Sequence, residues 1–156
     1  MILWFTGQPG SGKTTLCDKL KDDILYSYYY LKHKIIHLDG DDTREILDNK
    51  DYSKTGRRKN IQFTIDMARV LSNKGFLVLC SFVSPYRDMR ENLKSQGNVA
   101  EFYLKSKRDL RKEYWVDNYE PPLENFTQLD TDKPIKECID EILNVYRAMA
   151  ALSRRS

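Results

Sequence analysis

Residues 7–14 read GQPGSGKT, which satisfies the pattern G-x-x-x-x-G-K-[ST]. Ahead of them, residues 1–6 (MILWFT) form an uncharged, apolar run typical of a strand buried on both faces. Behind them, Leu16, Leu20 and Ile24 recur every four residues and predict an amphipathic helix. The motif requires a strand before it and a helix after it, so we interpret residues 7–14 as a phosphate-binding loop. A glycine-rich turn that fits by accident would leave this context unexplained.

Each part of this loop predicts a separate contact with a nucleoside triphosphate. The glycines let the backbone turn tightly and present N–H groups to a phosphate, and the start of the following helix favours anions. Lys13 supplies a positive charge for the outer phosphates, and the Thr14 hydroxyl is placed to ligate Mg²⁺. We therefore expect ATP and Mg²⁺ as cofactors. The predicted nucleotide-binding residues are Gly7, Gly10, Ser11, Gly12, Lys13, Thr14 and Thr15.

Strand-like and helix-like segments alternate along the rest of the chain. This alternation predicts an α/β fold of the P-loop NTPase type, a parallel sheet with helices on both faces. We expect one domain over residues 1–152 and a frayed tail at residues 153–156. Further strands are predicted at residues 35–38, 76–82, 99–104 and 126–129, and further helices at residues 60–73, after Ser84 and at residues 135–146.

Two of these helix predictions are specific about individual side chains. Gly75 is expected to end the helix over residues 60–73, and Ser84 is expected to cap the next helix, with Pro85 at its first position. The helix over residues 60–73 is expected to bury one apolar face, formed by Phe63, Met67, Val70 and Leu71.

The composition excludes several classes of protein. A net charge of +3 over 156 residues is too small to predict nucleic-acid binding as the main activity. Cys17, Cys80 and Cys138 are far apart in apolar surroundings, so we expect buried thiols rather than disulfides or metal ligands. No stretch approaches the roughly 20 apolar residues that span a membrane, and no basic leader precedes the first strand. We therefore expect a cytoplasmic protein with no nucleic-acid partner and no membrane partner.

A second polar loop follows the strand at residues 35–38. A carboxylate from Asp39 or Asp41 there can hold Mg²⁺ or accept a proton from an attacking hydroxyl, and Arg44 can hold an anionic acceptor. An acidic turn that merely starts a helix would use the same residues. A GTPase would show an Asn-Lys-x-Asp segment, and many ATPases end their third strand in acidic residues rather than Ser81. Both features are missing from the sequence, so the pattern favours a small kinase.

The chain resembles the adenylylsulfate kinase family, which phosphorylates the 3′-hydroxyl of adenylyl sulfate. Residues 39–44 match the family's Asp-Gly-Asp-Asn-x-Arg, and residues 51–62 answer its Gly-Phe-Ser-x-x-Asp-Arg-x-Glu-Asn-Ile-Arg. Residues 81–87 match Ser-Phe-Ile-Ser-Pro-Tyr-Arg. Residues 119–122 and 130–132 echo the late Tyr-Glu-x-Pro and Asp-Thr-Asp. The pieces occur in order after the P-loop, so the similarity covers nearly the whole chain.

The resemblance implies a kinase that transfers the γ-phosphoryl group of ATP to the 3′-hydroxyl of a nucleotide, in the first place adenylyl sulfate. Asp41 matches the candidate base, Asp39 supports the metal and the geometry, and Tyr52 replaces a phenylalanine that stacks on the acceptor base. The implied catalytic residues are Lys13, Asp39, Asp41 and Arg108, and the implied metal ligands are Thr14 and Asp39. The implied acceptor-binding residues are Asp41, Arg44, Tyr52, Arg57, Asn60, Ser84 and Pro85.

Some of these roles have plainer alternatives. Asn60 could instead cap a helix that begins near Ile61, and Arg57 could instead be one solvated charge in the run at residues 57–59. Gly56 and Lys59 replace two acidic residues of the family, which makes the acceptor side more basic. Dimers are common in the family, so a homodimer is one option for this chain.

The match fails in a short lid near residues 105–120. This lid keeps Arg108 and Tyr114 and offers Arg111 for a lysine, but the family's Phe-Thr-Gly clamp is absent. We expect Arg108 and Arg111 to reach the phosphates, where cations stabilise the charge that develops in transfer. The missing clamp is an acceptor contact. The same reaction on a cytidine diphosphate derivative, such as cytidine diphosphoramidate in capsule assembly, therefore stays open.

Two other classes of function stay open as well. The short lid is the only support for a non-catalytic ATP sensor. Phosphorylation of nucleic-acid ends is disfavoured, because the charge is low and the sequence has no extended basic face.

Overall fold

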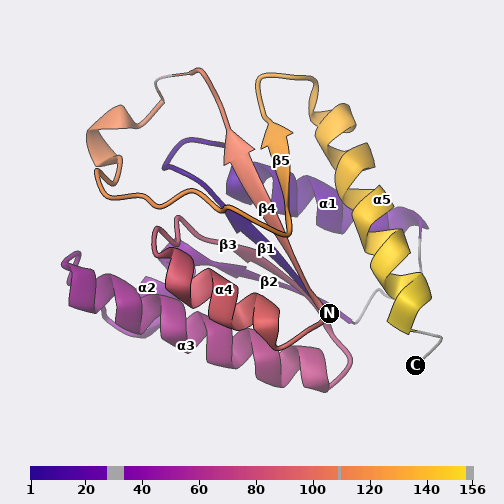
Figure 1. The fold of residues 1–156 in the computed structure, drawn as a ribbon, viewed down its shortest axis with the longest axis horizontal. Coiled ribbons are helices and arrows are strands. Elements are labelled where there is room, and N and C mark those ends of the chain that lie inside the picture. The colour runs from indigo at the N-terminus through magenta and orange to yellow at the C-terminus, as the bar shows by residue number, and fades with distance from the viewer. Residues whose placement is uncertain (28–33, 109, 154–156) are drawn as a thin grey trace.

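The computed structural model describes residues 1–27, 34–108 and 110–153. Five parallel strands form one sheet in the order β2-β3-β1-β4-β5 (Figure 1). The strands are β1 (Ile2–Thr6), β2 (Ile35–Asp39), β3 (Leu77–Ser81), β4 (Val99–Lys105) and β5 (Phe126–Asp130). The expected P-loop type of α/β fold is confirmed, and all five predicted strands are present.

Helices cover both faces of this sheet. Successive residues of β1 point to opposite faces, so Leu3 and Phe5 enter one apolar cluster, and Ile2 and Trp4 enter another. The first cluster packs under α1 (Lys13–Ser27) and α5 (Ile135–Ser153), and the second packs under α3 (Lys54–Asn73) and α4 (Arg87–Ser95) (Figure 1). The sheet is therefore buried on both sides, which explains the uncharged sequences of β1 and β3.

The strand register brings three loops together at one edge of the sheet. Ser81 at the end of β3 pairs with Phe5 of β1 on one side and with Asp39 of β2 on the other. The P-loop after β1, the short helix α2 (Gly40–Ile46) after β2 and the loop after β3 are therefore neighbours. Ligands of parallel α/β folds bind at this carboxyl edge.

The apolar face predicted for the third helix is only partly buried. Helix α3 begins at Lys54, where the Ser53 side chain caps it by accepting a hydrogen bond from Gly56 N, and Val70 is 55% exposed. The buried face includes small and polar residues that a hydropathy pattern does not select. Its members are Gly56, Asn60, Ile61, Thr64, Ile65 and Ala68. Gly75 lies just past the helix with φ +87°, so its predicted role in ending α3 is confirmed.

The predicted cap of the next helix is also wrong. Helix α4 begins at Arg87, and the side chain of its N-cap residue, Tyr86, makes no capping hydrogen bond. Ser84 lies earlier, in a left-handed conformation with φ +43°. Ser84 therefore belongs to the irregular loop over residues 82–86, and the helix begins only after this loop.

Helix α5 extends to Ser153, and residues 154–156 of the predicted tail lie outside the described residues. Cys17, Cys80 and Cys138 are free and buried, as predicted. Within the described part of the chain, no helix is both long and apolar enough to cross a membrane.

Candidate functional site

A cavity of about 850 Å³ lies at the carboxyl edge of the sheet. The P-loop, α2, the loop after β3 and lid residues 111–115 surround it, and α3 contributes Asn60. The fold thus brings most of the predicted site residues together. Those that line the cavity are Gly10, Gly12, Lys13, Thr14, Thr15, Asp39, Asp41, Arg44, Tyr52, Arg57, Asn60, Ser84 and Pro85.

The P-loop has the backbone conformation that its glycines predict. Gly10 and Gly12 have φ values of +80° and +91°, which residues with a side chain rarely adopt. A Cβ atom at Gly10 would lie 2.3 Å from the Leu110 carbonyl oxygen, because the lid backbone crosses the loop there. Gly7 and Ser11 do not line the cavity. Gly7 packs against the end of β4, where a Cβ atom at this position would lie 2.7 Å from the Leu104 carbonyl oxygen.

The Lys13 ammonium group lies inside the P-loop. It donates hydrogen bonds to the Gly7 carbonyl at 3.1 Å and to the Gln8 carbonyl at 2.9 Å. Burial lowers the Lys13 pKa from 10.5 to about 8, against the opposing effect of the nearby Asp39 carboxylate. A bound phosphate would raise this pKa again, because a nearby anion stabilises the protonated form of the lysine.

Three donors fix the Asp39 carboxylate. Its Oδ2 accepts hydrogen bonds from Thr14 Oγ1 at 2.8 Å and Ser81 Oγ at 2.5 Å, and its Oδ1 accepts one from Asp41 N at 2.9 Å. Burial opposes ionisation of Asp39, but these hydrogen bonds outweigh it and lower the pKa. His37 Nε2 lies 2.7 Å behind Ser81 Oγ and orients that hydroxyl.

These oxygen atoms fit Mg²⁺. Mg²⁺ binds few protein oxygens and takes its remaining ligands from phosphates and water, and the Thr14 hydroxyl and an ionised Asp39 lie side by side. Over residues 1–27, 34–108 and 110–153, no group of three or more His, Cys, Asp or Glu side chains could hold a metal ion. A cation at this site would therefore depend on the phosphates of the nucleotide.

Two buried polar atoms in the opposite half of the cavity have no partner among the described residues. Asn60 is 3% exposed and Ser84 is 2% exposed, and both Asn60 Oδ1 and Ser84 Oγ are unpaired. Asn60 Nδ2 donates to Thr43 Oγ1, so the amide oxygen is the free end. Because α3 begins at Lys54, Asn60 is not a helix cap. A buried oxygen without a partner is costly, and a ligand with hydrogen-bonding groups would satisfy it.

Two arginines surround the Tyr52 ring at the mouth of this half. Tyr52 is 63% exposed, and the guanidinium carbons of Arg44 and Arg57 lie 4.3 Å and 5.7 Å from its ring centroid. Arg57 Nε also donates to the Tyr52 carbonyl at 2.8 Å, so Arg57 is not merely a solvated charge. Gly56, in the first turn of α3, lets the segment before the helix pack closely against it. A Cβ atom at Gly56 would lie 2.2 Å from the Asp51 carbonyl oxygen.

The lid is fastened to the P-loop by contacts that the sequence did not reveal. The Gln8 amide donates to the Val116 carbonyl at 3.0 Å and accepts from Val116 N at 2.9 Å, and Trp115 Nε1 donates to the Pro9 carbonyl at 3.2 Å. The only sign of these contacts in the sequence is Gln8, a polar residue at a position that the motif leaves unspecified. We call the pair of bonds between Gln8 and Val116 the lid clasp.

The predicted position of Arg108 over the phosphates is wrong. Its guanidinium group lies at the ends of β4 and β5, where it donates to Asp132 Oδ1 at 3.0 Å and to the Thr131 carbonyl at 2.8 Å. Asp132 thus neutralises Arg108 outside the cavity. Arg111 lines the cavity, as its predicted place over the phosphates requires, and its backbone is left-handed with φ +55°.

Comparison with known families gives a match to the adenylylsulphate kinase model over residues 1–114. The chain belongs to the adenylylsulphate kinase family. An adenylyl-sulfate kinase from Geotalea daltonii is 38% identical over 106 residues, which is 65% of this chain and 49% of that protein. Another from Chloroflexus aurantiacus is 32% identical over 165 residues, 92% of this chain and 87% of that protein. In two other relatives of this name the match also spans only about half their length.

Solved structures extend the adenylylsulphate kinase likeness to nearly the whole fold. The Mycobacterium tuberculosis APS kinase CysC, in complex with AMPPNP and APS, superimposes with a TM-score of 0.80 over 94% of this chain and 96% of that one. The two are 22% identical in sequence, so this likeness concerns the fold alone. The family model ends at residue 114, and the segment that carries Trp115, Val116 and Tyr119 lies beyond it.

Proposed function

We propose that this chain transfers the γ-phosphoryl group of ATP to the 3′-hydroxyl of adenylyl sulfate, giving 3′-phosphoadenylyl sulfate. The observation that carries the proposal is one cavity with two unlike halves, a phosphate-binding loop on one side and unpaired buried polar atoms on the other. Relatives named adenylyl-sulfate kinase and a related fold solved with AMPPNP and APS support the choice of donor and acceptor.

The donor half binds the triphosphate. The N–H groups of the P-loop and the Lys13 ammonium group surround the phosphates, and Arg111 faces the same space from the lid. Thr14 and Asp39 would hold Mg²⁺, which neutralises phosphate charge when bound. Such transfer depends mostly on positioning and charge stabilisation, and these residues supply both.

The acceptor half holds the nucleotide whose hydroxyl attacks. Asp41 lines the cavity in the first turn of α2 and accepts the proton of the 3′-hydroxyl. The Tyr52 ring stacks on the base, and Arg44 and Arg57 hold the anionic groups. The unpaired Asn60 Oδ1 accepts a hydrogen bond from a hydroxyl or amino group of the acceptor.

The short lid favours a second candidate acceptor. The lid lines the cavity with Arg111, Glu113, Tyr114 and Trp115. The clamp expected between Tyr114 and Tyr119 is missing. A cytidine diphosphate derivative, such as cytidine diphosphoramidate in capsule assembly, would use the same donor half and the same hydroxyl. The first candidate places the enzyme in sulfate assimilation and the second in capsule biosynthesis, in the cytoplasm in both cases because ATP is the donor.

A panel of acceptors tests the proposal. Release of ADP is followed with Mg²⁺ and ATP alone, with adenylyl sulfate, and with cytidine diphosphate derivatives. We expect ADP release that depends on adenylyl sulfate and a product phosphorylated at the 3′ position. Faster release with a cytidine derivative would establish the second candidate. No acceptor-dependent ADP with any compound would leave a non-catalytic ATP sensor.

A further inference from the structure

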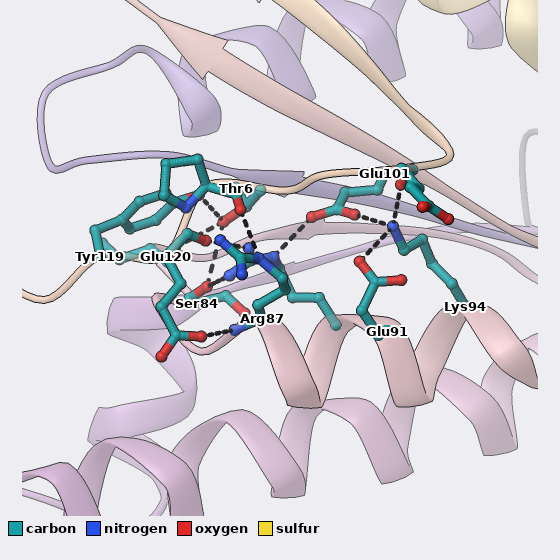
Figure 2. A network of polar contacts seen from close by, with 12 residues as sticks. Thr6, Ser84, Arg87, Glu91, Lys94, Glu101, Tyr119 and Glu120 are labelled. Carbon is teal, nitrogen blue, oxygen red and sulfur yellow. Dashed lines mark hydrogen bonds and ion pairs between the residues drawn. The ribbon is translucent and has the colours of Figure 1, made fainter.

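A fully buried ion pair lies beside the acceptor half of the cavity. Arg90 of α4 is 1% exposed and Glu101 of β4 is 2% exposed, and Arg90 Nε donates to Glu101 Oε1 at 2.7 Å. Lys94 reaches the other oxygen of Glu101 at 2.6 Å (Figure 2). Neither Arg90 nor Glu101 lines the cavity, so neither contacts a substrate directly.

The rest of the Arg90 guanidinium group connects two backbone segments. One terminal nitrogen donates to the Ser84 carbonyl, in the loop after β3. The other donates to the Glu120 carbonyl, at the C-terminal end of the lid. In Figure 2 the polar contacts around Ser84 and Glu120 gather next to Thr6 and Tyr119. Arg90 therefore fixes β4, the Ser84 loop and the end of the lid relative to one another.

Further hydrogen bonds join the same two segments. Glu120 N donates to the Pro85 carbonyl at 2.9 Å, and Arg87 N donates to Glu120 Oε2 at 2.8 Å. Thr6 Oγ1 donates to the Val83 carbonyl at 2.8 Å and lies 2.7 Å from the Tyr119 hydroxyl. Thr6 directly precedes the P-loop, so this network ends just before the donor half.

Stability alone does not explain a buried charge here. Burying an ion pair costs desolvation free energy, and well-packed apolar residues of similar volume often serve as well or better. An apolar pair, however, cannot hold two carbonyls and a carboxylate in one plane, as the fork of a guanidinium group does. Ser84 also has a left-handed backbone with φ +43°, which needs support from its surroundings.

We propose that Arg90 is a positioning residue for the acceptor half of the cavity. It acts through the Ser84 and Glu120 carbonyls, and so sets where Ser84 Oγ and Pro85 meet the acceptor. This inference rests on the proposed function. The donor half does not depend on Arg90, because Lys13, Thr14 and Asp39 are held by their own hydrogen bonds.

Arg90→Lys separates positioning from charge. The lysine keeps a cation for Glu101 but cannot reach both carbonyls. We expect the KM for adenylyl sulfate to rise about tenfold or more, as for a displaced binding group, while the KM for ATP stays within about twofold. The matched control is Arg58→Lys, because Arg58 pairs with Asp88 on the surface and does not line the cavity. Its two KM values should match those of the wild type.

Arg90→Met combined with Glu101→Leu provides a second test, in case Arg90→Lys does not fold. The apolar pair removes the buried charges, so a purely structural role predicts normal kinetics in a folded protein. Positioning predicts the same selective rise in the KM for adenylyl sulfate. An unchanged KM for adenylyl sulfate in either folded variant would overturn the inference.

Hydrogen exchange tests the inference without an acceptor, even if the proposed function fails and the wild type turns over no acceptor. The Arg87 and Glu120 amides are bonded across the two segments. We expect them to exchange about tenfold faster or more in a folded Arg90 variant than in the wild type, while amides of β1 keep their rates. Unchanged exchange at both amides would refute the positioning role.

Discussion

Lys13 makes nucleotide binding depend on pH. Its pKa of about 8 in the free protein means that it loses its charge as the pH rises through 8, and a neutral amine no longer attracts phosphate. Because binding requires the protonated form, we expect the Kd of a non-hydrolysable ATP analogue to rise above this pH, by up to about tenfold per pH unit. Calorimetric titrations at pH 7, 8 and 9 measure this. A flat profile would show that Lys13 keeps its proton throughout.

Asp41 is the candidate base, and its neutral isostere separates this role from binding. Asp41→Asn keeps the size of the side chain and removes its ability to take the hydroxyl proton. We expect kcat to fall at least about a hundredfold while the KM for ATP changes little. Steady-state kinetics with adenylyl sulfate give both values, and near-normal turnover would exclude Asp41 as the base.

At the scale of single residues, the sequence predicted donor groups better than lid groups. The P-loop spacing places Lys13 and Thr14 by local backbone geometry, so their positions follow from the motif. The position of Arg108 depends on Asp132, which is 24 residues further along the chain. Similarly, the free oxygen of Asn60 depends on where Thr43 lies. No local pattern contains such long-range pairings.

The lid clasp acts between two elements, and one substitution removes it. Gln8→Met keeps the length of the side chain but loses both hydrogen bonds to Val116. We expect the lid to open more often, and the structure offers a reporter for this. Of the two tryptophans, Trp4 is 1% exposed, so quenching of fluorescence by acrylamide reports mainly on Trp115 of the lid.

Acrylamide should therefore quench Gln8→Met more strongly than the wild type. The matched control is Gln62→Met, because Gln62 is exposed on α3 and, among the described residues, its side chain bonds within that helix to Asp66. Equal quenching in all three proteins would mean that the clasp does not hold the lid closed.

Elements differ in how far their sequences predict them. Strands such as β3 are buried on both faces, so an uncharged run suffices to identify them. Helix α3 is harder, because its buried face includes Thr64 and Asn60 while Val70 is exposed. Its packing is decided by the sheet and by the cavity that it borders. The prediction of Ser84 as a cap is wrong because the Ser84 carbonyl is held by Arg90 and by Thr6, which lies 78 residues earlier in the chain.

At the scale of the whole molecule, the donor site is part of the folded edge of the sheet and should couple to global stability. A ligand that binds only the folded state adds RT ln(1 + [L]/Kd), about 2.7 kcal/mol at a hundredfold excess over Kd. We expect Mg²⁺ with AMPPNP to raise the Tm of the wild type by several degrees. Thermal denaturation with and without the ligand measures this shift.

Lys13→Ala should fold but show little or no such shift. A full shift in that variant would place the nucleotide elsewhere. The alternation of strands and helices predicts the layers of the molecule, and the motif predicts the edge where the donor binds. The acceptor half could be predicted only in part, because it combines α2, α3, the loop after β3 and the lid.

Gly10 limits how this enzyme can be redesigned. The lid backbone crosses it so closely that a single methyl group would strike the Leu110 carbonyl, 2.3 Å from where that group would lie. A longer lid taken from a relative would have to cross the P-loop at the same point. The P-loop and the lid backbone are already in close contact there, so no other path fits. Grafts that begin after the crossing should preserve ATP binding, whereas those that move the crossing should weaken it.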